Sequence, residues 1–192
     1  NLEALEKGIP NLLQHLDNMC NVFGIPTVVA INAFPTDTEQ EIELVEKKCA
    51  ELGAKVVRSE VWAKGGEGGI KLAKEVLELT ERGHRQLEFA YDLNQPIKEK
   101  IRCIAKKIYR ANDVVFESKA NKAIKQIEKL GYGDLPICMA KTQFSFSDDP
   151  KLLGAPRDFE IIVTEVKVDS GAGFIVVKTG NILTMPGLPK LP

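Results

Sequence analysis

The chain has 192 residues, of which 44% are hydrophobic and 28% charged, a composition typical of a soluble globular protein. Its formal net charge of −1 gives no general attraction to nucleic acid. No apolar run approaches the roughly 20 residues of a membrane-spanning helix, and the first residues lack the basic start and apolar core of a signal peptide.

The cysteines indicate a reducing compartment. They are widely spaced and form no CxxC pair, and neither histidine lies at zinc-ligand spacing from any of them. We therefore expect reduced thiols in a cytoplasmic protein. Because the chain does not begin with Met, we also expect it to be a piece of a longer protein. The cysteines are Cys20, Cys49, Cys103 and Cys138.

A helix and a strand come first in chain order. Apolar residues recur at spacings of three and four over residues 2–23, which predicts a helix with one apolar face. Pro10 is expected to kink this helix or divide it in two. Residues 27–31 are largely apolar and rich in β-branched side chains, as in a strand buried on both faces of a parallel sheet.

The same order then repeats. Thr36 or Asp37 is expected to cap a helix over 38–52, in a capping box with an acid or amide three residues on. Residues 55–62 predict a second strand, and residues 70–80 a third helix. Connections this short imply right-handed crossovers and a parallel sheet.

The pattern changes between residues 83 and 97, where Gly, Asn and Pro mark a boundary. Two later runs, 159–168 and 174–178, flank a Gly-rich turn and predict an antiparallel hairpin. Residues 184–192 contain too much Pro and Gly for regular structure. Before the hairpin, helices alternate with short strands, predicted at 97–110, 114–116, 118–130 and 136–140.

The fold class predicted from these elements is α/β. A portion of a parallel, Rossmann-like or P-loop-type sheet is followed by a smaller α+β subdomain with an antiparallel hairpin. We expect the first domain to cover residues 1–90 and to carry ligand-site loops. The second is expected over residues 91–192, ending in the Pro- and Gly-rich tail.

Two aromatic side chains are predicted at the carboxyl ends of neighbouring strands. Phe34, followed by Pro35, comes after the first strand, and Trp62, the only tryptophan, ends the second. Ligands of open α/β sheets gather at this edge. Two such rings would form a clamp for a planar heterocycle. The alternative is that Phe34 simply packs on the next helix.

A glycine-rich loop follows Trp62. Its residues Lys64, Gly65, Gly66 and Glu67 lead into a helix N-terminus, and a backbone or anion-binding loop is one interpretation. A tight turn without a ligand is the other. The loop is neither GxxxxGK(S/T) nor GxGxxG, and the first of these motifs occurs nowhere in the chain.

The polar loop over residues 141–149 also follows a predicted buried strand. It suits a ligand loop and a capped surface loop equally well. No nucleophile, histidine and acid can be assembled into a catalytic set anywhere in the chain. The sequence therefore predicts no catalytic residue and no metal ligand.

Four segments closely resemble the formate–tetrahydrofolate ligase family of bacteria, in its monofunctional type. The resemblance runs through almost the whole chain and corresponds to the C-terminal portion of the family. It implies an ATP-dependent joining of formate to N10 of tetrahydrofolate through formyl phosphate. The segments are VVAINAFPTDTE (28–39), SEVWAKGGEGG (59–69), LGYGDLPICMAKTQFSFSDDP (130–150) and ILTMPGLPK (182–190).

The resemblance also implies roles for particular residues. Phe34 and Trp62 correspond to the aromatic side chains that hold the pterin of tetrahydrofolate, and Pro35 accompanies Phe34. The family has an apolar residue near position 58, where this chain has Arg58. The substrates and cofactors implied are formate, tetrahydrofolate, ATP with Mg²⁺, and a monovalent cation, in a homotetramer with neither nucleic acid nor membrane as partner.

The nucleotide-binding loop of the family lies upstream of these motifs, as do its basic residues for formyl phosphate. Neither is present in this chain, so we expect the chain alone to be inactive. The alternative is a non-catalytic folate-binding or assembly module, either a split subunit or a relic. A different P-loop-like ATP enzyme would need its own phosphate loop and would leave Phe34 and Trp62 unexplained.

Overall fold

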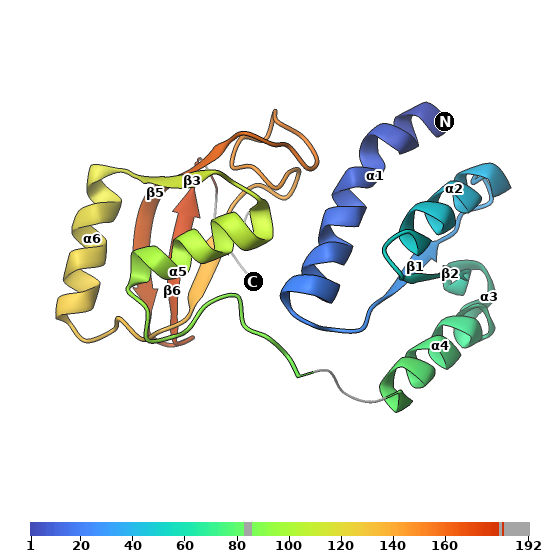
Figure 1. Ribbon diagram of the computed structural model, residues 1–192, viewed down its shortest axis with the longest axis horizontal. Coiled ribbons are helices and arrows are strands. Elements are labelled where there is room, and N and C mark those ends of the chain that lie inside the picture. Colours follow the sequence, from blue (N-terminus) through green and yellow to red (C-terminus); the bar gives the residue numbers. More distant parts are fainter. Residues whose placement is uncertain (83–85, 181, 183–192) are drawn as a thin grey trace, which may run out of the picture. The chain divides into compact units, whose positions relative to one another are not determined.

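The computed structural model describes residues 1–82, 86–180 and 182 (Figure 1). The chain divides into two compact units, Asn1–Phe89 and Ala90–Pro192. The first contains a parallel sheet and the second a mixed sheet with one antiparallel pair, which confirms the predicted α/β class. The tail predicted at 184–192 lies outside the described residues. No helix in the described ranges is long and apolar enough to cross a membrane.

The first unit starts with a single helix. This helix, α1 (Leu2–Asp17), continues into a π-helical turn at Asn18–Val22. Pro10 lies inside α1 and does not divide it. The elements after it are β1 (Val28–Asn32), α2 (Glu39–Ala50), β2 (Lys55–Ser59), α3 (Val61–Lys64), a 3₁₀ turn (Gly65–Gly69) and α4 (Ile70–Glu81).

Strands β1 and β2 form a two-stranded parallel sheet joined through α2. Their register pairs Val28 with Lys55 and Asn32 with Ser59. The prediction that the second strand reaches residue 62 is wrong, because β2 ends at Ser59. The chain turns at Glu60, whose carbonyl accepts hydrogen bonds from the N–H groups at 63 and 64. Trp62 therefore lies in the short helix α3 rather than at a strand end.

The predicted cap of α2 is also wrong by one or two residues. Thr38 is the N-cap, and its hydroxyl accepts from the Glu41 N–H while the Glu41 carboxylate accepts from the Thr38 N–H. Asp37 is not available as a cap because its carboxylate accepts from the backbone N–H of Phe34, 2.8 Å away.

The second unit contains a four-stranded sheet in the order β3-β5-β6-β4. The outer strands are parallel to their neighbours, and the β5–β6 hairpin is antiparallel as predicted. The elements are α5 (Ile97–Ile104), a π-helical turn (Ala105–Tyr109), β3 (Asp113–Phe116), α6 (Ser118–Lys129), β4 (Ile137–Ala140), β5 (Glu160–Asp169) and β6 (Phe174–Thr179).

A continuous apolar core fills the second unit. Ile97 and Ile101 on α5, Ile124 on α6 and alternate residues of β5 and β6 are buried together. Figure 1 shows α5 lying across the sheet. Lys100 is fully buried beside this core, and its ammonium donates to the carbonyl oxygens of Gly133 (2.7 Å) and Leu135 (3.1 Å). That side chain fastens α5 to the connection between α6 and β4.

Candidate functional site

A tight turn presents Phe34 at the carboxyl end of β1. The Ala33 N–H donates to the Ser59 carbonyl at 3.0 Å, which extends the β1–β2 ladder by one residue. The Asp37 N–H then donates to the Phe34 carbonyl at 3.0 Å, and Pro35 occupies the second position of the turn, where its fixed φ is favourable. The backbone of Phe34 is thus held from both sides.

Trp62 meets Phe34 face to face. The two ring centroids lie 5.6 Å apart with an interplanar angle of 25°. The indole Nε1–H donates to the carbonyl oxygen of Ala33 at 2.8 Å. Phe34 is 49% exposed and Trp62 54%, so the stacked pair remains open to solvent. The structure therefore brings together the two aromatics that the sequence singled out, with Phe34 stacked on Trp62.

The glycine-rich loop is shaped by its close approach to Glu60. The Glu60 N–H donates to the Gly68 carbonyl at 3.2 Å. A Cβ at Gly68 would lie 2.5 Å from the carbonyl carbon and oxygen of Glu60, a distance that no side chain tolerates. Gly65 has φ 57° and ψ −144°, a backbone conformation open to glycine alone. Gly65 is thus accounted for by its backbone conformation and Gly68 by its contact with Glu60.

Charged side chains near this edge are paired with one another. Lys64 contacts Glu60 at 2.8 Å, and this hydrogen bond lowers the pKa of Glu60. Arg58 contacts Glu39 at 2.7 Å, which raises the pKa of Arg58. The Arg58 guanidinium is therefore directed to the start of α2. An anion-binding role for the loop from Lys64 to Glu67 stays a prediction.

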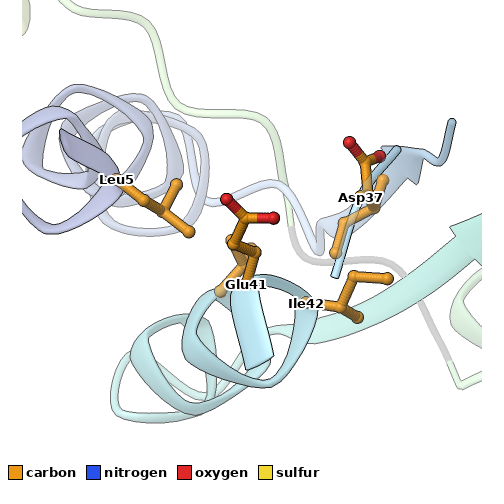
Figure 2. Close-up of a pocket in the computed structure, with 6 residues that line it drawn as sticks. Leu5, Asp37, Glu41 and Ile42 are labelled. Carbon is orange, nitrogen blue, oxygen red and sulfur yellow. The ribbon is translucent and has the colours of Figure 1, made fainter. Parts of the chain in front are cut away.

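A small pocket lies behind the Phe34 turn, between α1, β1 and α2. Its volume is about 250 Å³, and Figure 2 shows the side chains of Asp37 and Glu41 beside the apolar Leu5 and Ile42. The Asn1 amino group and then the backbone and hydroxyl of Thr38 bond to the Glu41 carboxylate and lower its pKa to about 2. The lining residues are Leu5, Ile31, Asp37, Glu41, Ile42 and Val45.

A second cavity of about 580 Å³ runs along β2 between α2 and α4. Arg58, Lys71 and Lys74 contribute positive charge to it, and four glutamates contribute negative charge. In the part of the chain that the structure describes, neither cavity is lined by Phe34 or Trp62. This agrees with the direct stacking of the two rings, which leaves no volume between them.

The loop over residues 141–149 directs its polar groups inward. The Lys141 ammonium donates to the carbonyl oxygens of Thr142 and Ser145 and lies 5.2 Å from the centre of the Tyr109 ring. Burial lowers the pKa of Lys141. Ser147 is fully buried, and the Asp148 carboxylate accepts from the Ile162 N–H at 2.8 Å. This bonding favours the capped-loop interpretation over the ligand loop.

Three contacts of this site were missed from the sequence. They are the Ala33 carbonyl that anchors Trp62, the Asp37 carboxylate that closes the Phe34 turn, and the backbone approach of Gly68 to Glu60. The turn that places Asp37 had a local indication, since Pro is favoured at the second position of such turns. The other two join residues that are distant in the sequence or in different elements.

The metal expected from the resemblance has no assigned ligands here. Within residues 1–82, 86–180 and 182, no three or more His, Cys, Asp or Glu side chains are grouped to hold an ion.

A comparison with models of protein families matches residues 1–192 to formate–tetrahydrofolate ligase. Because the match covers the full length given, the chain belongs to the formate–tetrahydrofolate ligase family.

Proposed function

We propose that this chain supplies the pterin-binding part of a formate–tetrahydrofolate ligase, with the pterin held by Phe34 and Trp62 beside Pro35. The observation that carries the proposal is the stacked, half-exposed ring pair beyond the carboxyl ends of β1 and β2. Flat heterocycles bind well to such faces, and ligands of parallel sheets gather at this edge. We name tetrahydrofolate as the ligand because the chain belongs to the formate–tetrahydrofolate ligase family.

In the ligase reaction, formate attacks the γ-phosphorus of ATP to give formyl phosphate and ADP. N10 of tetrahydrofolate then attacks the formyl carbon, and phosphate leaves. We assign two tasks to this chain. It orients the pterin, and with it N10, and it keeps water away from formyl phosphate. A fixed aromatic wall suits the first task because it limits the ring to one plane.

Phosphoryl transfer is assigned to residues outside this chain. Charge stabilisation of that step requires a phosphate-binding loop with Mg²⁺, and the 192 residues contain no GxxxxGK(S/T) motif. We propose that ATP, Mg²⁺ and the monovalent cation bind mainly elsewhere, and that this chain alone does not turn over. The alternative is a folate-binding module that takes part in no ligase. It predicts the same folate binding, so the two are distinguished by whether adding this chain to the remainder of the enzyme restores ligase activity.

The first unit is proposed to be part of a larger parallel domain. Among the described residues, β1 pairs only with β2, so each strand has one edge without a partner. Two-stranded sheets are marginal by themselves in water. Additional parallel strands beside β1 would bury the side chains that β1 leaves half exposed.

Titration calorimetry of reduced tetrahydrofolate into the chain tests the proposal. Trp62→Ala and Phe34→Ala are each expected to weaken binding by about tenfold or more, because loss of one stacking face costs roughly 1–3 kcal/mol. Phe144→Ala is the matched control, since Phe144 is also exposed (60%) but belongs to the second unit. Equal weakening by all three variants, or by none, contradicts the proposal.

A further inference from the structure

Trp62 is anchored by a hydrogen bond of its side chain, and it lies in a turn whose backbone is hydrogen-bonded at neighbouring residues. Its indole N–H is bonded to the Ala33 carbonyl at 2.8 Å. The helix that carries it is closed by N–H groups of residues 63 and 64 donating to the Glu60 carbonyl, at 3.0 and 2.9 Å. Glu60 itself donates to the Gly68 carbonyl at 3.2 Å. Movement of the indole ring away from Ala33 therefore breaks one hydrogen bond, and movement of the whole 60–64 segment breaks its backbone hydrogen bonds as well.

Gly68 makes this anchoring possible. A Cβ there would lie 2.5 Å from the Glu60 carbonyl atoms and 2.9 Å from the Val61 nitrogen, all of them backbone atoms that cannot swing aside. Gly66, two residues earlier in the same loop, has no atom within 4 Å of a Cβ built on it. A methyl group is therefore tolerated at 66, whereas at 68 it must push the segment 60–62 away.

The Phe34 ring has only van der Waals contacts to lose. Its backbone is fixed by Asp37, but its side chain is half exposed and has no polar atom. A pterin inserted between the rings needs them about 7 Å apart, two layers of about 3.5 Å each. The centroids lie 5.6 Å apart. One ring must move, and rotation of Phe34 about its χ1 breaks no hydrogen bond.

We infer that Trp62 is the fixed wall of the pterin site, that Gly68 is the positioning residue for this wall, and that Phe34 is the moving wall. Phe34 occupies the pterin position on Trp62 until the ligand displaces it. This inference rests on the proposed function for its ligand. The fixed arrangement of Trp62 is nevertheless a property of the chain by itself and is testable without folate.

The first experiment follows the single indole N–H signal of the ¹⁵N-labelled chain by NMR and measures its exchange with water. Gly68→Ala is expected to speed exchange roughly two- to tenfold, the factor that loss of one hydrogen bond gives. Gly66→Ala and Phe34→Leu are expected to change it by less than about twofold. Circular dichroism establishes that each variant is folded. Unchanged exchange in folded Gly68→Ala, or faster exchange in Phe34→Leu, overturns the fixed wall.

The second experiment adds reduced tetrahydrofolate to the same sample and stays decisive even if Gly68→Ala does not fold. The indole exchange rate is expected to remain within about twofold of its starting value, while the Phe34 ring signals, identified by their loss in Phe34→Leu, shift. Faster indole exchange with an unchanged Phe34 ring makes Trp62 the moving wall and overturns the inference. Absence of binding by calorimetry refutes the proposed function instead, and the first experiment then decides whether Trp62 is fixed.

Discussion

The two units differ in how much apolar surface they bury. In the second, alternate residues on one face of the β5–β6 hairpin form a connected core with α5 and α6. In the first, the connected buried cluster consists of Leu16, Cys49 and Ala54, and the described α4 has no buried residue. The unit with the larger core keeps its polar loop bonded inward, while the unit with the smaller core exposes the aromatic pair. Stability and the proposed binding site are thus concentrated in different units.

The largest effect is expected in the core of the second unit. Ile161 on β5 is fully buried, and Ile161→Ala should lower the free energy of unfolding by about 2–5 kcal/mol through lost burial and a residual cavity. The next residue, Ile162, is 44% exposed, and Ile162→Ala should cost well under half as much. Urea unfolding followed by circular dichroism measures both. Similar costs would show that the buried face of β5 does not belong to a tightly packed core.

The next largest effect is a loss of stability of the second unit at alkaline pH. Burial raises the pKa of Tyr109 to about 12. Between pH 10 and 12 the unfolded phenol loses its proton while the folded one keeps it, so the unfolded state binds fewer protons and stability falls as pH rises. The loss should approach about 2–3 kcal/mol near pH 12.

Tyr109→Phe is the matched control for that pH dependence. It retains the ring beneath the Lys141 ammonium but removes the ionisable hydroxyl. The urea midpoint of the unaltered chain should therefore fall more than that of Tyr109→Phe as pH rises from 9 to 11.5. A difference that does not change with pH would mean that the Tyr109 phenol is not desolvated.

A smaller effect is expected at the start of α2 in the first unit. Thr38→Ala removes the capping hydroxyl and should cost about 1 kcal/mol. Thr36→Ala changes an exposed residue of the preceding turn and should have little effect. Unfolding followed by Trp62 fluorescence reports on this unit. An equal loss of unfolding free energy at positions 36 and 38 would support Thr36, which the sequence predicted as a possible cap, over Thr38.

Local patterns in the sequence predicted most elements because each has its own periodicity. The β-branched run at β1 and the spaced isoleucines of α5 are examples. The same reasoning extended β2 too far, since Val61 and Trp62 both favour strands. What ends the strand is the approach of Gly68 to Glu60, a contact that no local pattern contains.

The candidate site was predicted in its residues but not in its geometry. Parallel strands end at one edge, so Phe34 and Trp62 were expected near each other. Their direct stacking and the Ala33 anchor depend on the turn at Glu60. The parallel pairing of β3 with β5 was likewise beyond prediction, because about 45 residues separate strands whose order is decided by packing.

Fluorescence of Trp62 tests the central claim most directly, because it is the only tryptophan in the chain. The chain is titrated with reduced tetrahydrofolate and, in parallel, with p-aminobenzoylglutamate, which shares the tail of the ligand but lacks the pterin. Both titrations are corrected for inner-filter absorption. We predict saturable quenching by tetrahydrofolate alone. Binding that is detected by calorimetry but leaves Trp62 fluorescence unchanged, or equal quenching by the two compounds, would contradict a pterin site at Phe34 and Trp62.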